Sequence, residues 1–334
     1  MIIKLSTCSP SWNFTLQTPN SYGRWDGVQF FVDRDCPQAD VWVVYEAIYS
    51  TMTTLCPPSR TLFITGEPPL DMKRYPEKFA NQFARVLTSY SIPHKGRIAW
   101  QQALPWHYGR NLDTNGNESF VENYNSLMQT DPFPNKERQI STVCSNKNKL
   151  PAHKKRDEFV TFLQRSSIDG LDVFGRGRAR QVACKRDAIA PYKYHIVLEN
   201  SVFPDYWTEK LSDAYLGGAY PFYWGCPNLE KYFPGGSFTH INIDRPEEAL
   251  RTIRETMARN AYEESIPLLR IARELVLNRY NLFPTILSLF RDLPEAETPV
   301  PVTIRPAECF SLRGRIRQVR WRIGKFLGKT GPGR

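Results

Sequence analysis

The sequence predicts an α/β protein built from two doubly wound, Rossmann-like domains with parallel sheets. Three observations predict it. The chain has 334 residues, more than one hydrophobic core usually serves. Its first half holds short β-branched and aromatic runs between Pro, Gly and Asp, and its second half alternates such runs with helix-length segments. Strands joined through helices form right-handed parallel units, so we expect ligands at the carboxyl ends of the strands.

In the first half, the runs at 41–45 (Val-Trp-Val-Val-Tyr) and 61–65 (Thr-Leu-Phe-Ile-Thr) predict buried strands. The chain turns polar over 109–137, where Asn, Asp, Gly and Pro are frequent, and we place the domain boundary there. We therefore predict an N-terminal domain at 1–136 and a C-terminal domain at 137–295. A Pro-containing linker with a basic tail follows at 296–334.

The second half carries the clearer alternation of strands and helices. Its predicted strands are 139–144, 172–174, 194–198, 220–224 and 238–243. Its predicted helices are 157–163, 207–216 and 246–264.

The seven cysteines are scattered, with no Cys-x-x-Cys pair, which favours reduced structural thiols in a cytoplasmic protein. No run of about 18 apolar residues appears, and the apolar stretch at the N-terminus is too short for a signal peptide. We therefore expect a cytoplasmic location.

The net charge of +10 is concentrated in the tail. Residues 310–334 hold eight cations and no acid, which leaves the rest of the chain nearly neutral. Within 312–327, five apolar residues recur at helical spacing, so we predict a basic amphipathic helix on an anionic membrane surface. A helix packed on the body and a nucleic-acid arm are the alternatives.

One predicted strand ends in polar residues at the expected ligand edge. Glu199, Asn200 and Ser201 follow that strand, and Asp205 is the predicted N-cap of the next helix. Lys210 then lies in the first helical turn, where the helix dipole is unfavourable for a cation unless an anion lies between them. A diphosphate would provide that anion, although a solvated surface lysine has the same spacing.

The spacing of these residues resembles the donor-binding signature of the α-1,3/4-fucosyltransferases, glycosyltransferase family 10, over roughly 139–260. The matching segments are Glu199-Asn200-Ser201, Asp205-Tyr206-x-Thr208-Glu209-Lys210-Leu211, Ala219-x-Pro221 and Gly225-x-Pro227. Flanking segments continue the resemblance in order: Phe174-Gly175-Arg176, Tyr192-Lys193-Tyr194 and Pro234-x-x-Ser237-Phe238. Upstream, Thr65-Gly66-Glu67-Pro68 resembles the family's short motif with the catalytic glutamate.

The resemblance implies a GT-B fold, in which two Rossmann-like domains face a cleft, and an inverting transfer of fucose from GDP-fucose. The acceptor would be a glycan or glycolipid, with an α-1,3 linkage to an N-acetylglucosamine-type residue. It implies Glu67 as the base that takes the proton of the acceptor hydroxyl.

The same resemblance implies the donor-binding residues. Arg156 and Lys210 would contact the diphosphate and Glu209 the ribose hydroxyls, while Asn200 and Tyr206 would line the donor pocket. We expect no cofactor and no metal, with side chains meeting the phosphate charge instead. Another GDP-sugar is one alternative donor. A nucleic-acid-binding protein with an arginine-rich tail is the alternative from a different class, although we expect no nucleic-acid partner.

Overall fold

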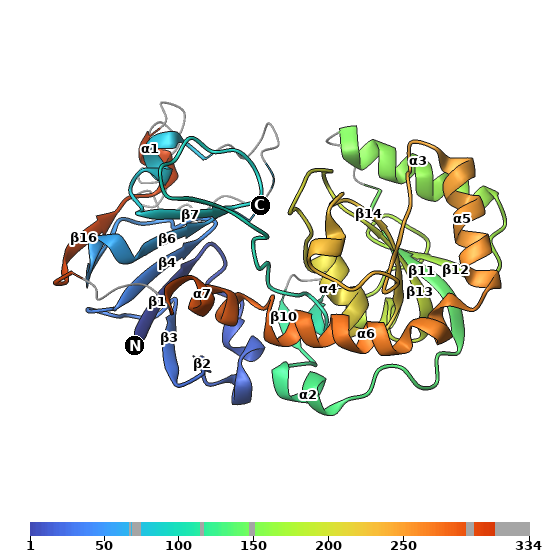
Figure 1. The fold of residues 1–334 in the computed structure, drawn as a ribbon, viewed down its shortest axis with the longest axis horizontal. Helices are drawn as coiled ribbons and strands as arrows, with labels where there is room; N and C mark the ends of the chain where they lie inside the picture. Colours follow the sequence, from blue (N-terminus) through green and yellow to red (C-terminus); the bar gives the residue numbers. More distant parts are fainter. Residues whose placement is uncertain (67, 69–74, 114–116, 147–150, 292–296, 311–334) are drawn as a thin grey trace. The chain divides into compact units, whose positions relative to one another are not determined.

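The computed structural model describes residues 1–66, 68, 75–113, 117–146, 151–291 and 297–310 (Figure 1). The contacts divide the chain into two compact units. The first unit holds Met1–Pro10, Gly23–Trp100 and the chain from Phe290 onward. The second unit holds Ser11–Tyr22 and Gln101–Leu289.

The first unit is built on a seven-stranded sheet in the order β2-β3-β1-β4-β6-β7-β8, parallel except between β2 and β3. In chain order its strands are β1 (Ile2–Thr7), β2 (Arg24–Trp25), β3 (Val28–Val32), β4 (Val41–Tyr45), β6 (Thr61–Ile64), β7 (Arg85–Thr88) and β8 (Arg97–Ala99). A separate antiparallel pair joins β5 (Met52–Cys56) to β16 (Val300–Ile304), and the short helix α1 spans Glu77–Ala80.

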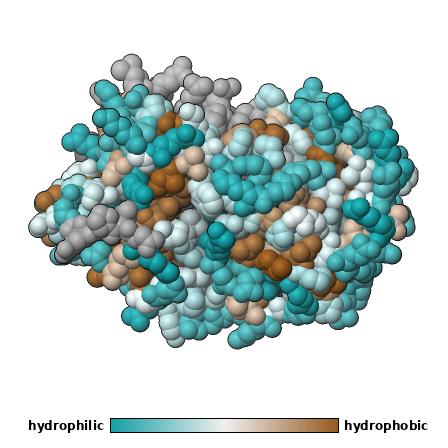
Figure 2. Space-filling view, in the orientation of Figure 1, coloured by the Kyte–Doolittle hydropathy of each residue, from teal (hydrophilic) through white to brown (hydrophobic). Residues whose placement is uncertain are grey.

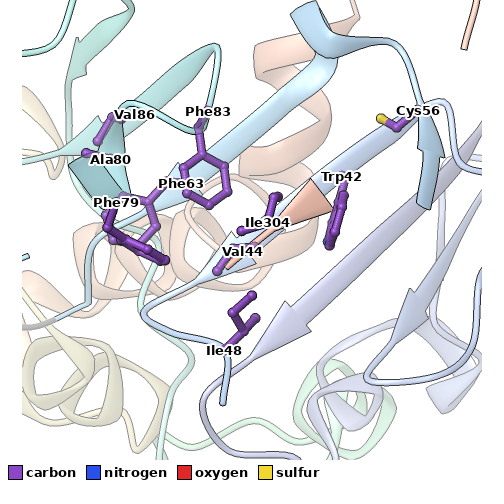
Figure 3. Close-up of a cluster of buried hydrophobic side chains, with 10 residues drawn as sticks. All are labelled: Trp42, Val44, Ile48, Cys56, Phe63, Phe79, Ala80, Phe83, Val86 and Ile304. Carbon is purple, nitrogen blue, oxygen red and sulfur yellow. The ribbon is translucent and has the colours of Figure 1, made fainter. Parts of the chain in front are cut away.

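Hydrophobic side chains from the sheet, α1 and β16 form one core cluster of the first unit. Figure 3 shows its members: Trp42, Val44, Ile48, Cys56, Phe63, Phe79, Ala80, Phe83, Val86 and Ile304. The Phe63 ring centroid lies 5.1 Å from that of Phe79 and 5.4 Å from that of Phe83. Each buried aromatic ring contributes about 1.5–3 kcal/mol through loss of apolar surface from water, so this cluster holds α1 and β16 against the sheet.

The second unit contains a five-stranded, fully parallel sheet in the order β12-β11-β13-β14-β15. In chain order its strands are β11 (Arg138–Val143), β12 (Leu171–Phe174), β13 (Tyr192–Leu198), β14 (Tyr220–Trp224) and β15 (Thr239–His240). A small antiparallel pair, β9 (Arg110–Leu112) and β10 (Glu118–Phe120), belongs to the same unit.

Four helices connect and cover this second sheet (Figure 1): α3 (Pro151–Arg165), α4 (Glu209–Leu216), α5 (Pro246–Ala258) and α6 (Ala261–Asn278). The short helix α2 (Tyr124–Gln129) precedes β11, and α7 (Leu282–Phe290) follows α6 and ends at Phe290, where the chain returns to the first unit. Helix α3 packs with α5, and α4 packs with α6. Because α3 leads from β11 to β12 and α4 from β13 to β14, both connections are parallel crossovers.

The parallel α/β class predicted from the sequence is confirmed, and so are the strands at 41–45 and 220–224. The predicted helix at 157–163 is the second half of the longer α3. The predicted helix at 246–264 begins at Pro246 as expected, but its predicted end is wrong: α5 ends at Ala258, because Asn260 has a φ of 57° and a second helix, α6, begins after it. The predicted strand at 238–243 shortens to two residues.

The two units divide the chain differently from the predicted ranges 1–136, 137–295 and 296–334. Residues 101–136 belong to the second unit, including the polar stretch predicted as the boundary, which supplies β9, β10 and α2. Segment 11–22 also belongs to the second unit, although it precedes most of the first in sequence. The predicted amphipathic tail at 312–327 lies outside the described residues.

The face of the molecule in Figure 2 is mostly hydrophilic, with hydrophobic residues in separate patches. All seven cysteines are free thiols. Among the residues that the structure describes, no helix is both long enough and apolar enough to cross a membrane.

Candidate functional site

The strand order places a topological switch point in the second sheet between β11 and β13. From β11 the chain moves to β12 on one side, and it then returns to β13 on the other. Open parallel sheets bind ligands beyond the carboxyl ends of the two strands at such a point. Here β11 runs into Cys144 and Ser145, and β13 runs into Glu199 and Asn200. We call this the β11–β13 edge.

Helix α4 begins at this edge and is capped by Thr208. The Thr208 Oγ1 accepts a hydrogen bond from the Lys210 backbone N–H at 3.3 Å. The buried Glu199 carboxylate holds the cap in turn, accepting from the Thr208 N–H at 2.8 Å and from its hydroxyl at 2.7 Å. A strand-end carboxylate therefore fixes where the helix N-terminus lies.

The prediction that Asp205 is the N-cap is wrong. Asp205 lies in the loop before the helix with φ of 63°. Its carboxylate accepts hydrogen bonds from the Tyr232 hydroxyl at 2.6 Å, Lys231 Nζ at 2.9 Å and Asn228 Nδ2 at 3.0 Å. Asp205 thus ties the loop to the segment after β14, and Thr208 is left to cap α4.

Lys210 is surrounded by oxygen atoms at the start of α4. Its Nζ lies 3.0 Å from Glu209 Oε1, 3.0 Å from Thr208 Oγ1 and 3.4 Å from Glu199 Oε2. Burial alone would lower the pKa of Lys210, but Glu209 and Glu199 outweigh it and raise the pKa above its ordinary value. The ammonium is therefore charged at neutral pH, and 23% of the side chain is exposed to solvent.

Glu209 is ionised as well. Burial acts to raise its pKa, but Lys210, His107 and Lys185 together hold the pKa well below its ordinary value. The Glu209 side chain is 16% exposed. An exposed edge of ionised carboxylate at a helix N-terminus can accept hydrogen bonds from ligand hydroxyl groups.

Behind Glu209 lies a group of residues that sequence reasoning did not identify. Lys185 Nζ lies 3.9 Å from Glu209 Oε1 and 2.8 Å from Asp213 Oδ2. The fully buried Asp213 also accepts from the backbone N–H groups of His107 and Tyr108, both at 2.8 Å. These contacts join segments far apart in sequence, so no local spacing could have revealed them.

Arg156 projects from α3 toward the same edge. The side chain is buried, and its Nη1 donates to the Leu198 carbonyl at the end of β13 at 3.1 Å. Its buried Nε has no hydrogen-bond partner among the described residues. A buried donor without a partner costs about 1–3 kcal/mol, and an acceptor group bound at this N–H would remove that cost.

A second arginine at this edge also escaped sequence reasoning. Arg178 Nε donates to the Cys144 carbonyl at 3.1 Å, and its guanidinium pairs with Asp157 of α3. Burial raises the pKa of the Cys144 thiol, whereas Arg156 and Arg178 both act to lower it, because both cations lie near the end of β11. Three cations thus lie at the β11–β13 edge: Arg156, Arg178 and Lys210.

The remaining predicted site residues are Asn200, Tyr206 and Glu67. Asn200 is half-buried and follows Glu199 at the edge, whereas Tyr206 is 1% exposed, with its ring centroid 4.7 Å from that of Phe203. Any contact of Tyr206 with a ligand would therefore involve only a small part of its side chain. Glu67 lies outside the described residues.

Among the described residues, no three His, Cys, Asp or Glu side chains are grouped so as to hold a metal ion. The first unit does contain an Asp-x-Asp triplet, Asp33-Arg34-Asp35, a spacing common in metal-dependent transferases. Its first carboxylate accepts hydrogen bonds from the backbone N–H and hydroxyl of Thr7, at 2.7 Å and 2.6 Å.

Residues 133–262 match the profile of glycosyltransferase family 10 (fucosyltransferase), C-terminal domain. The chain is 32% identical over 177 residues to 4-galactosyl-N-acetylglucosaminide 3-alpha-L-fucosyltransferase 9 of Bos taurus, covering 50% of this chain and 46% of that protein. It is 29% identical over 183 residues to an alpha-(1,3)-fucosyltransferase of Helicobacter pylori, covering 52% and 37%. The matched region thus spans less than half of these relatives.

Among solved structures, an alpha1,3-fucosyltransferase with GDP-fucose aligns with a TM-score of 0.47 and 17% identity, covering 89% of this chain and 93% of that one. The same enzyme class with GDP aligns with a TM-score of 0.45 and 16% identity, covering 84% and 92%.

Proposed function

We propose that this protein transfers fucose from GDP-fucose to a hydroxyl group of an acceptor glycan, because residues 133–262 match the C-terminal domain model of glycosyltransferase family 10 (fucosyltransferase). The names of the bovine and Helicobacter pylori relatives support an α-1,3 linkage, and the bovine name supports an N-acetylglucosamine-type acceptor. The observation that carries the proposal is the cationic β11–β13 edge at the N-terminus of α4.

A nucleoside diphosphate fits the chemistry of this edge. The first turn of α4 offers backbone N–H groups and the positive end of a helix dipole. Lys210 adds a fixed ammonium, and the unpartnered Nε of Arg156 adds a planar donor suited to phosphate oxygens. We assign the diphosphate to Lys210 and Arg156, and we add Arg178 as a third cation.

Glu209 and its neighbours fit the nucleoside part of the same ligand. The ionised, partly exposed carboxylate can accept hydrogen bonds from the two ribose hydroxyls, as acidic residues do in nucleotide sites. Lys185 and Asp213 hold it from behind. Asn200 and Tyr206 keep their assignment to the donor pocket as part of this proposal.

We propose an inverting transfer without a metal. Charge develops on the departing diphosphate as the bond from fucose to phosphate breaks, and cations fixed beforehand stabilise that charge best in the transition state. Glu67, which follows Gly66 beyond β6, is the proposed base for the acceptor hydroxyl. We further propose that the two units are the two domains of a GT-B enzyme, in which the first unit receives the acceptor.

The cellular assignments also belong to this proposal. We propose a cytoplasmic enzyme that associates with an anionic membrane surface through 312–327 and acts on a glycan or glycolipid. A protein lacking 310–334 should then bind anionic vesicles less well while keeping transfer to a soluble saccharide.

The test is a panel of nucleotide sugars with N-acetyllactosamine as acceptor, followed by nucleotide release and product mass. We expect turnover with GDP-fucose and little with UDP-galactose. Equal turnover with GDP-mannose would show that the site reads the nucleotide rather than the sugar. Turnover with UDP-sugars alone would refute the proposal.

A further inference from the structure

The first unit has a switch point of its own, between β1 and β4. From β1 the chain moves to β3 on one side, and it then crosses to β4 on the other. Cys8 follows β1 and Glu46 follows β4. The Cys8 thiol donates to Glu46 Oε2 at 3.0 Å, so the two side chains meet across the switch point. Open parallel sheets bind ligands at such positions, as described above for the second sheet.

Glu46 is held in an unusual backbone conformation. Its φ of 62° lies in the left-handed region that residues with a side chain rarely adopt, and its N–H donates to the Ile64 carbonyl at 2.9 Å. Strain of this kind costs about 1–3 kcal/mol and gathers at functional positions. The carboxylate lies over Gly66, since a Cβ there would meet Glu46 Oε1 at 1.8 Å.

The segment that carries Cys8 is fixed from two directions. Asp33 at the end of β3 accepts two hydrogen bonds from Thr7, the last residue of β1. The Tyr49 hydroxyl donates to the Cys8 carbonyl at 2.8 Å, although 67% of the Tyr49 residue is exposed. Tyr49 is therefore an exposed aromatic residue held against Cys8, whose thiol contacts the Glu46 carboxylate.

Tyr75 brings a buried hydroxyl to the same place. Its ring packs on the core cluster of Figure 3, with centroid distances of 4.8 Å to Phe63 and 6.4 Å to Phe79. The Tyr75 hydroxyl is buried, and the Gly66 backbone and the Glu46 carboxylate lie close enough to it to affect its pKa. Burial, followed by the nearby Glu46, raises the pKa of Tyr75 well above its ordinary value, so it remains a donor.

We propose that Cys8, Glu46, Tyr49 and Tyr75 form a saccharide site in which Glu46 accepts hydrogen bonds from sugar hydroxyls. A neutral sugar presents hydroxyl donors to a carboxylate and apolar ring faces to an aromatic side chain. The negative charge of Glu46 disfavours a phosphate or another carboxylate at this place. The inference rests on the proposed function, and the sugar bound at this site is the acceptor of that transfer.

The experiment measures alkylation of Cys8 by iodoacetamide in the full chain, read by mass spectrometry, with and without N-acetyllactosamine. Cys309 is the internal control, because it and Cys8 are the two half-buried thiols while the other five are buried. The disaccharide is used at ~10 mM, above the usual range of Michaelis constants. We expect at least threefold slower alkylation of Cys8 and no change at Cys309.

The variant Glu46→Gln should need an at least tenfold higher disaccharide concentration for the same protection of Cys8. The control is Glu77→Gln, which replaces an exposed glutamate of α1 and should leave the protection unchanged. For each variant, protection is the ratio of the Cys8 alkylation rates without and with the disaccharide, so a change in the intrinsic reactivity of the thiol cancels. Unprotected Cys8 in the unmodified protein, or full protection in Glu46→Gln, would overturn the site.

Stabilisation by GDP, measured on the same samples, separates this inference from the proposed function. If GDP raises the Tm but the sugar does not protect Cys8, the saccharide site alone fails. If the sugar protects Cys8 but GDP has no effect, the donor assignment fails instead.

Discussion

Replacing Glu199 with alanine should both destabilise the second unit and weaken nucleotide binding. Glu199 is fully buried, and its two oxygens accept both hydrogen bonds of Thr208, the residue that caps α4. The same carboxylate lies 3.4 Å from Lys210 Nζ. Its removal leaves a buried hydroxyl and a partly buried ammonium with fewer partners.

The expected loss is about 3–5 kcal/mol, the usual result of removing one partner of a buried ion pair. In a domain of about 150–250 residues each kcal/mol lowers the Tm by about 2–4 °C, so the Tm should fall by about 6–20 °C. Glu199→Gln keeps the volume and one acceptor oxygen, and about 1–2 kcal/mol should be lost.

The assay combines thermal denaturation with calorimetric titration of GDP. Because the N-terminus of α4 loses its anchor, we expect GDP affinity to fall at least tenfold in Glu199→Ala. Glu230→Gln is the matched control, since Glu230 is 57% exposed and pairs only loosely with His240 at 3.3 Å. A Glu199→Ala protein with an unchanged Tm and unchanged GDP affinity would refute the reasoning.

Four further predictions follow from the site. Glu67→Gln should lower kcat and leave GDP affinity unchanged, because a base acts mainly in the transition state; normal turnover would remove Glu67 from the mechanism. Burial lowers the pKa of both His107 and His195 to about 3. The unfolded chain therefore binds more protons than the folded one below pH ~6.5, and acidification to pH 4.5 should lower the free energy of unfolding by up to about 2–3 kcal/mol per histidine. His195→Gln should make this loss smaller when the Tm is measured as a function of pH. GDP should raise the Tm by more than UDP or ADP do, and equal shifts would contradict guanine recognition. EDTA should leave transferase activity unchanged. A loss of activity that manganese restores would contradict the metal-free mechanism and make Asp33 and Asp35 candidate metal ligands.

Much of the second unit could be predicted from the sequence because its signals are local. The run at 220–224 is apolar throughout, as expected for a strand buried on both faces, and β14 spans those residues. The placement of Glu209 and Lys210 at the start of a helix is likewise confirmed. Strand and helix periodicity are properties of neighbouring residues, so they can be read without the fold.

The errors arose where tertiary contacts decide. Asp is a residue type that is common at N-caps, but the Asp205 carboxylate accepts hydrogen bonds from Tyr232, Lys231 and Asn228 beyond β14. Thr208 caps the helix instead. Lys185 and Asp213 support Glu209 through contacts between distant segments.

The central claim is that the β11–β13 edge recognises a nucleoside diphosphate through its phosphates. The most direct measurement is calorimetric titration of the full chain with GDP, GMP and guanosine, repeated with Lys210→Ala. We predict that affinity falls at each loss of a phosphate and that Lys210→Ala reduces the difference between GDP and guanosine. Equal affinity for GDP and guanosine, or a Lys210→Ala protein that binds GDP as tightly as the unmodified chain, would contradict the account.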